Sequence, residues 1–224
     1  MVNRLKSYFY QRFKTSFSKS GEDIQLWQLL KKDKGTYIDI GGHHPIFGNN
    51  SFFFYIRNWR GIVVEPNPVF KKMYWKYRPK DILISDGIAD FDGELDYFEF
   101  ESSVFNSFSK EHLGKIDLLS SVRNVKSVPV KKLSTVVMEN GFNNLTIDFL
   151  SIDVEGLEME VLRGNNWHSC RPRYILLESH QNLKDDLKSE ISSYLDEKDY
   201  SLIGKSMLSN NIGTLWYKSN ENVI

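Results

Sequence analysis

Short β-rich runs alternate with helical segments from residue 36 to about residue 200. The buried runs are TYIDI (36–40), GIVVE (61–65), DILIS (81–85), DFLSIDV (148–154) and RYILLES (173–179). Segments with helical patterning separate most of them. This alternation is typical of parallel, doubly wound sheets, because a parallel connection needs a crossover element. We therefore expect an α/β, Rossmann-like fold with a mostly parallel sheet and helices on both faces.

The last two β-rich runs differ from the others, because only a short polar loop joins them. They are YSLIGK (200–205) and GTLWYK (213–218), and they predict an antiparallel edge pair that completes a seven-stranded sheet with an antiparallel edge strand. Two alternating runs around Asp92-Gly93 predict a β-hairpin. Residues 102–127 are polar without a clear period, which is typical of a functional or mobile loop.

The first 20 residues differ in charge from the rest of the chain. They contain five basic residues and no acidic one, and four apolar residues recur at helical spacing: Leu5, Phe9, Phe13 and Phe17. We interpret 1–20 as a basic amphipathic arm and 21–224 as a single domain. The arm would pack on the domain or on a second subunit, giving a homo-oligomer, or lie on a membrane surface. Ser20 and Asp23 predict a capping box for the helix that follows.

Composition excludes several classes of function. Lys plus Arg and Asp plus Glu number 29 each, so no overall field attracts nucleic acid or membranes. Cys170 is the single cysteine, so no internal disulfide can form. No apolar run reaches the ~20 residues of a transmembrane segment, and the start lacks the apolar core of a secretion signal. We expect a cytoplasmic protein.

Ligands of such sheets bind beyond the carboxyl ends of the strands, where this chain has glycines and carboxylates. Asp39, Gly41 and Gly42 end the first strand, where the glycines allow close approach and Asp39 can hold the loop or an amino group. Glu65 ends the second strand and could accept both hydroxyls of a ribose. The third ends in Asp86-Gly87, beside the expected adenine edge. With His43 and His44 after the glycines, the loop departs from the pyrophosphate-binding fingerprint and suits a nucleoside without phosphates.

Five segments in this order resemble the FkbM-type methyltransferase family: SGED (20–23), YIDIGGHHP (37–45), NWRGIVVEPNP (58–68), IDFLSIDVEGLEMEVLRG (147–164) and RPRYILLESH (171–180). The resemblance implies a Rossmann-like methyltransferase fold that uses S-adenosyl-methionine. It implies that Asp39, Gly41 and Gly42 line the methionine side of the cofactor, with Glu65 on the ribose and Asp86 near adenine. It also implies Asp153 beside the amino group or the reacting methyl, and a direct cofactor role for Glu22 or Asp23.

Methyl transfer to a hydroxyl needs a group that removes the proton, since a neutral alcohol is a poor nucleophile. Asp153, Glu155, Glu178 and His180 follow the fourth and fifth strands and are the candidates, with Asp153, Glu178 and His180 as the predicted catalytic set. The same three residues could instead hold a divalent ion such as Mg²⁺ or Mn²⁺ that binds and acidifies the acceptor hydroxyl. His43 and His44 are further candidates for a base or for a structural role.

Three functions remain open. The leading hypothesis is an O-methyltransferase acting on a hydroxyl of a sugar, a sugar nucleotide or a surface-glycan precursor. An NAD-dependent oxidoreductase could also bind a ribose through Glu65, but the first loop departs from the pyrophosphate-binding fingerprint of such enzymes. A non-catalytic binding subunit would keep the fold, although acidic residues at four strand ends argue for an intact site.

Overall fold

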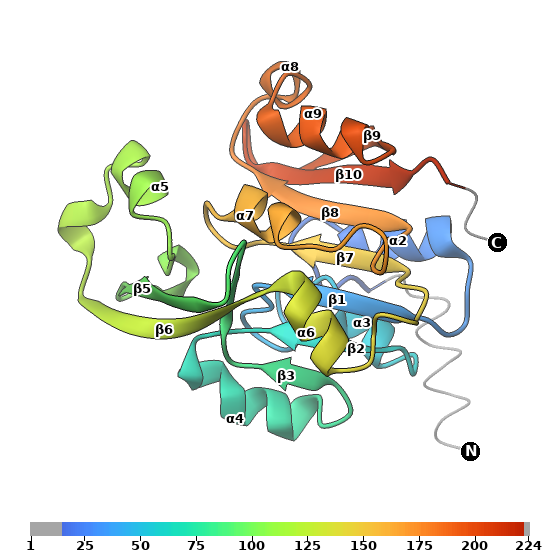
Figure 1. Cartoon of the computed structure of the whole chain (residues 1–224), viewed down its shortest axis with the longest axis horizontal. Helices are drawn as coiled ribbons and strands as arrows, with labels where there is room; N and C mark the ends of the chain where they lie inside the picture. Colours follow the sequence, from blue (N-terminus) through green and yellow to red (C-terminus); the bar gives the residue numbers. More distant parts are fainter. Residues whose placement is uncertain (1–14, 222–224) are drawn as a thin grey trace.

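The computed structural model describes residues 15–221, and a seven-stranded sheet forms its centre (Figure 1). The strands are β1 (Thr36–Ile40), β2 (Arg60–Val64), β3 (Ile82–Ile84), β7 (Phe149–Ile152), β8 (Tyr174–Ser179), β9 (Tyr200–Met207) and β10 (Gly213–Ser219). Their order is β3-β2-β1-β7-β8-β10-β9. The order runs outward from β1 in both directions, which creates a switch point between β1 and β7 where such sheets bind ligands.

The strand directions confirm the predicted fold class. β3, β2, β1, β7 and β8 pair in parallel, whereas β10 is antiparallel to both β8 and β9. β9 and β10 form the expected antiparallel pair at one side of the sheet, with β9 outermost and β10 second. The short loop between them permits this pairing, because an antiparallel connection needs no crossover helix.

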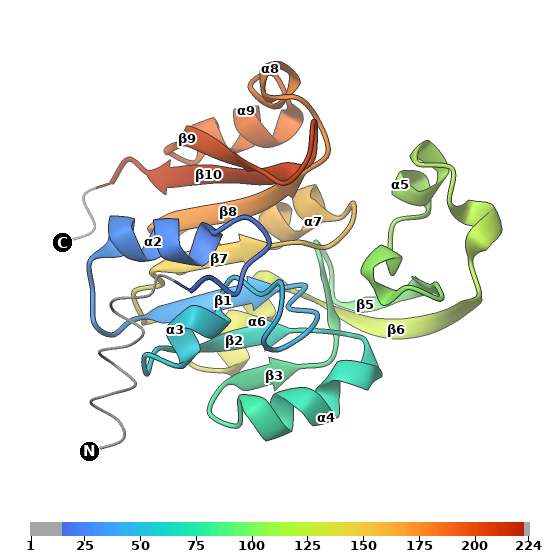
Figure 2. The same ribbon diagram turned by 180° about the vertical axis from the view of Figure 1, so that it is seen from behind.

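Helices cover both faces of the sheet (Figures 1 and 2). One face packs against α2 (Glu22–Leu30), α3 (Phe52–Tyr55) and α4 (Pro68–Tyr77), and the other against α6 (Leu133–Glu139), α7 (Glu158–Arg163) and α9 (Glu190–Glu197). Side chains of β1 alternate between the two cores: Tyr37 packs in the first, and Ile38 and Ile40 pack in the second. A short helix, α8 (Leu183–Asp186), follows β8.

A smaller sheet extends from one end of the molecule (Figure 1). It consists of β4 (Gly87–Ala89), β5 (Gly93–Glu99) and β6 (Asn124–Lys132) in the order β4-β6-β5. The predicted hairpin at Asp92-Gly93 is therefore wrong, because β4 and β5 pair with β6 and not with each other. The Asp92 carboxylate instead accepts the main-chain N–H of Lys132 at 2.8 Å and the hydroxyl of Thr135 at 3.1 Å.

Residues 102–123, most of the segment without a clear period, form short helices at the outer end of this small sheet (Figure 2). They contain the 3₁₀ turns η1 (Ser103–Phe105) and η2 (Leu119–Ser121) and the helix α5 (Lys110–Lys115). Ser109 caps α5 by accepting the N–H of His112 at 3.1 Å, and Leu113 is fully buried. Local hydrogen bonds and the buried side chain of Leu113 therefore hold this segment in place.

Residues 15–20 pack against the domain. The main-chain N–H of Phe17 donates to Asp23 at 2.7 Å, and the Phe17 ring packs edge-on against Phe52. The predicted capping box is wrong, because α2 begins after a left-handed Gly21 and Asp23 binds residues 16–18 instead. The stripe residues Leu5, Phe9 and Phe13 lie outside the described residues. Between residues 15 and 221 no helix is long and apolar enough to cross a membrane.

Candidate active site

A cavity of about 420 Å³ opens at the carboxyl ends of the central strands. Such a volume lies within the range of small-molecule and cofactor sites. Its wall includes four residues predicted as cofactor ligands: Gly41, Glu65, Gly87 and Asp153. The loops after β1, β2 and β7 and the small sheet therefore meet at one pocket.

Main-chain pairing brings the first three of these strand ends together. Ile40 pairs with both Val64 and Ile152, so the next residues of each strand, Gly41, Glu65 and Asp153, lie side by side. The N–H of Gly41 donates to the carbonyl of Val64 at 3.0 Å, and that of Asp153 donates to Ile40 at 3.0 Å. The parallel register alone therefore places these three residues at the cavity.

The two glycines of the first loop have different surroundings. Gly41 has a left-handed φ of 81° and lines the cavity. Gly42 does not line the cavity; it packs under Tyr74, and its carbonyl accepts hydrogen bonds from Asn49 at 2.8 Å and from the Tyr74 hydroxyl at 2.9 Å. These hydrogen bonds hold the loop at Gly42.

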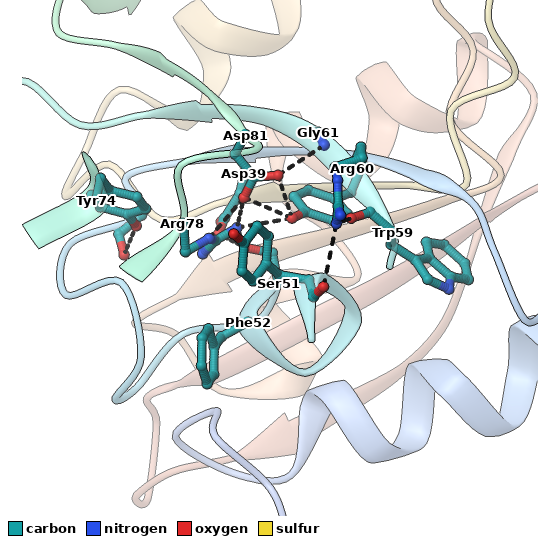
Figure 3. A network of polar contacts seen from close by, with 12 residues as sticks. Asp39, Ser51, Phe52, Trp59, Arg60, Gly61, Tyr74, Arg78 and Asp81 are labelled. Carbon is teal, nitrogen blue, oxygen red and sulfur yellow. Dashed lines mark hydrogen bonds and ion pairs between the residues drawn. The ribbon is translucent and has the colours of Figure 1, made fainter. Parts of the chain in front are cut away.

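Asp39 belongs to a buried polar network behind the loop (Figure 3). Its carboxylate accepts a short hydrogen bond from Ser51, and burial raises its pKa against the opposing charge of Arg78. Arg78 donates to Asn49 at 3.0 Å, to Ser51 at 2.8 Å and to Asp81 at 2.8 Å. Because Asn49 in turn holds the carbonyl of Gly42, the network positions the glycine loop from behind. Asp39 itself does not line the cavity.

Glu65 is the carboxylate best placed to bind a ligand. It is 6% exposed, and its two oxygens accept the main-chain N–H groups of His43 and Asn67, each at 2.7 Å. Burial raises its pKa to about 7. Each carboxylate oxygen can accept two hydrogen bonds, so each retains one for a ligand hydroxyl.

Two other predicted cofactor residues, Asp86 and Glu22, are not among those that line the cavity. Asp86 lies 3.9 Å from the ammonium of Lys131. Glu22 is buried, where it accepts hydrogen bonds from the main chain of Ser20 at 2.7 Å and from Thr214 at 3.0 Å. Glu22 thus ties the start of α2 to β10.

Asp153 forms an ion pair that the sequence did not predict. Lys19 places its ammonium 3.0 Å from Asp153 Oδ2 and 3.3 Å from Glu178 Oε1. Burial and the charge of Glu178 raise the pKa of Asp153. Burial opposes the ionisation of Glu178, but hydrogen bonds with His180 and Asp153 lower its pKa. The two carboxylates thus share one cation, and Asp153 is the more readily protonated of the pair.

The predicted metal set is only partly assembled. Ligand atoms of Glu155, Glu178 and His180 lie within 4.8 Å of one another, and Asp153 is not part of this group. His180 Nε2 lies 3.3 Å from Glu178 Oε2 and 3.8 Å from Glu155 Oε2. Glu155 lines the cavity, whereas Glu178 and His180 are not among the residues that line it. Of the predicted catalytic trio, only Asp153 therefore belongs to the cavity wall.

The two histidines of the first loop line the cavity, and burial lowers the pKa of each. His43 Nε2 hydrogen-bonds Ser103 of η1 at 3.0 Å. His44 Nδ1 accepts the N–H groups of Ile46 and Phe47, both at 3.1 Å, which requires that nitrogen to be unprotonated. His44 is thus a structural acceptor, and His43 joins the loop to residues 102–127.

Sequence reasoning missed Lys19 as a site residue and His112 as a neighbour of Glu155. Lys19 is 134 positions from Asp153 and appeared only as one charge of the basic arm. His112 lies in a segment with no periodic pattern, and its Nε2 is 3.8 Å from Glu155 Oε2. No local pattern could have revealed either contact, because both depend on the packing of distant segments.

The cavity fits a nucleoside with a zwitterionic tail. The free acceptor capacity of Glu65 suits a pair of ribose hydroxyls, and Pro66, Ile88 and Phe108 supply apolar walls suited to a purine ring. At the end of β7, Asp153 could accept a hydrogen bond from an amino group. These donors and acceptors match S-adenosyl-methionine in kind.

One family of known proteins matches most of the sequence. The family model of the methyltransferase FkbM domain matches residues 39–202. No curated protein matches the sequence. Similar solved structures include the putative methyltransferase yhhF from Escherichia coli (9% identity, TM-score 0.46, 88% of this chain and 84% of that one). Another is the 1,6-didemethyltoxoflavin-N1-methyltransferase of Burkholderia thailandensis, solved with S-adenosylhomocysteine (8%, 0.49, 98% and 87%). Since the family model covers well over half of its length, the chain belongs to the FkbM family of S-adenosyl-methionine-dependent methyltransferases.

Proposed function

We propose that the chain methylates a hydroxyl oxygen of a sugar, most simply a sugar nucleotide or another precursor of a surface glycan. The observation that carries this proposal is the placement of two carboxylates in the wall of one cavity, at the ends of the two strands that flank β1. Glu65 would bind the cofactor ribose, and Asp153 would face the acceptor. A hydroxyl acceptor must lose a proton, and a carboxylate in the cavity wall can take it.

The roles of the residues follow from their positions. S-Adenosyl-methionine, when bound, supplies a methyl group that its sulfonium already activates. Gly41 and Glu65 would fix the adenosyl part so that the acceptor oxygen meets the methyl carbon in line. Asp153 would receive the hydroxyl proton while Lys19 balances its charge. Glu178 and His180 would position Asp153 and Glu155 from behind.

Three polar residues of the cavity wall come from the small sheet and the segment around η1. They are Tyr97, Ser103 and Asn106, and none of them belongs to the central sheet. Polar groups in this position suit an acceptor with several hydroxyls. Acceptor choice would therefore depend on the part of the chain with the least regular sequence pattern.

Calorimetric titration tests the cofactor first. We expect S-adenosylhomocysteine to bind one site per chain and NAD to show no binding. Binding of NAD alone would favour the oxidoreductase instead. Methyl uptake from labelled S-adenosyl-methionine would then be measured over a panel of sugar nucleotides. S-Adenosylhomocysteine binding without methyl transfer to any sugar would overturn the proposed acceptor and favour a non-catalytic subunit.

A further inference from the structure

Four side chains from three separate parts of the chain converge beside the acceptor end of the cavity. We call His112, Glu155, Glu178 and His180 the histidine–carboxylate cluster. Glu155 Oε2 lies 3.8 Å from Nε2 of both His112 and His180, and Glu178 Oε2 lies 3.3 Å from Nε2 of His180. The two imidazole rings face each other edge-on, with centroids 5.6 Å apart. The ligand atoms of Glu155, Glu178 and His180 lie within 4.8 Å of one another, and Nε2 of His112 approaches this group at Glu155.

The backbone around Glu155 is held in an unusual conformation. Glu155 has a φ of 53°, in the left-handed region that non-glycine residues rarely occupy. The next residue, Gly156, has a φ of 104°, and a Cβ at that position would lie 2.4 Å from Cβ of His112. The Ser107 hydroxyl also donates to the carbonyl of Glu155 at 2.7 Å. Such strain gathers at functional sites, and here it brings the segment carrying His112 against Glu155.

His112 has unsatisfied hydrogen-bonding capacity. Its Nε2 is buried and makes no hydrogen bond within the described part of the chain. Buried polar atoms are nearly always paired, so an orphaned imidazole nitrogen that points at a carboxylate requires an explanation. A ligand shared by His112 and Glu155 would supply it.

Three carboxyl groups, those of Asp153, Glu155 and Glu178, lie together beside the histidines, and Lys19 pairs with two of them. Lys19 contacts Asp153 Oδ2 and Glu178 Oε1, which leaves Glu178 Oε2 and Glu155 Oε2 facing the histidines. A cation held on the histidine side would contact both of these oxygens.

We propose that the histidine–carboxylate cluster binds one divalent transition-metal ion, Mn²⁺ or Zn²⁺. Imidazole and carboxylate together suit these ions. Ligand atoms about 2.1 Å from a tetrahedral centre lie roughly 3.4 Å apart, near the 3.3 Å and 3.8 Å that separate His180 Nε2 from Glu178 and Glu155. His112, which contacts only Glu155 of this group, would have to move closer to become the fourth ligand. This site differs from the trio expected from sequence, because Asp153 pairs with Lys19 while Glu155 joins Glu178 and His180. Its role rests on the proposed function: the ion would bind the acceptor hydroxyl beside Glu155 and lower its pKa.

Direct ion binding tests the site. The full chain would be freed of metal with a chelator and titrated with Mn²⁺ by electron paramagnetic resonance and with Zn²⁺ by calorimetry. We expect one ion per chain, with affinity reduced at least tenfold in His112→Ala and in Glu155→Gln. The matched control His168→Ala changes an exposed histidine and should bind as the wild type. Circular dichroism and thermal unfolding of the metal-free variants would show that they fold.

Two results would overturn the proposal: no binding of either ion, or unchanged binding in both folded cluster variants. These results are separable from failure of the proposed function. S-Adenosylhomocysteine binding and sugar methylation, both measured after chelation, report on the function alone. Full methylation by the metal-free protein would remove the ion's catalytic role and leave the methyltransferase in place.

Discussion

The left-handed Gly41 lies directly against the main-chain carbonyl of Asp153, and a Cβ at position 41 would stand 1.7 Å from that oxygen. Two neighbouring parallel strands thus end in backbone contact at the cavity. The cofactor loop after β1 and the proposed catalytic loop after β7 are positioned by the same contact. A change in one loop must therefore disturb the other.

Gly41→Ala should disable the site and weaken the fold. The added methyl overlaps backbone, which cannot rotate away, and the left-handed φ is strained for alanine. We expect a loss of at least about 2 kcal/mol in unfolding free energy, measured with urea, and no detectable S-adenosylhomocysteine binding. Gly204→Ala is the control, because a Cβ there has no neighbour within 4 Å. Normal cofactor binding by Gly41→Ala would contradict the proposed role of this loop.

Cofactor affinity should depend on pH through Glu65. Its pKa of about 7 means that the free carboxyl is largely protonated under mildly acidic conditions. Ribose hydroxyls would donate to the ionised form, so S-adenosylhomocysteine should bind more tightly as pH rises through about 7. Calorimetry from pH 5.5 to 8.5 would check this, with values chosen to span that pKa at roughly equal distance on both sides. Glu65→Gln should bind about tenfold more weakly at high pH and lose most of the slope.

The same raised pKa predicts a pH dependence of stability. Between the ordinary carboxyl value and about 7, the folded protein keeps a proton on Glu65 that the unfolded chain has released. Unfolding free energy should therefore fall as pH rises through this window. Other buried acids with raised pKa values contribute with the same sign, so the informative quantity is the difference between wild type and Glu65→Gln. Urea unfolding at a series of pH values should give the variant a shallower decline; equal slopes would refute the assignment.

Asp153→Asn should abolish turnover while the protein still folds. Asparagine has nearly the same shape but cannot take up the acceptor proton. We expect a loss of about 10³-fold in kcat, with S-adenosylhomocysteine binding reduced far less. Single-turnover methyl transfer and calorimetry measure the two effects separately. An active Asp153→Asn would show that the proton leaves by another route.

Arg78 should be essential for stability, although it lies away from the cavity. Its guanidinium is fully buried, and it pairs with Asp81 and donates to Asn49 and Ser51. Arg78→Met would leave buried carboxylates without a partner, at a cost of about 3–5 kcal/mol in unfolding free energy. The control Arg123→Met removes an exposed ion pair and should change stability by less than about 0.5 kcal/mol. Similar unfolding curves for both variants would refute this account.

The sequence predicted several parts of the structure because short-range patterns encode them. Alternating β-rich and helical runs led to the central sheet, and the short loop before β10 led to the antiparallel pair. Strand ends placed Gly41, Glu65 and Asp153 together, since parallel neighbours end at one edge. The predicted hairpin at Asp92-Gly93 was wrong because its turn signal reports only on neighbouring residues. The main chain of β5 instead pairs with β6, about 30 residues further along the chain.

By itself, the sequence determined which residues stand at the carboxyl edge, because side-chain periodicity and strand direction depend on neighbours in the chain. Only the tertiary structure decided what those residues face. In the folded chain, Asp39 is buried in the polar network behind the glycine loop. Lys19 contacts Asp153, and His112 lies beside Glu155. Contacts between distant segments depend on how whole layers pack, and that information is spread over the chain and leaves no local pattern.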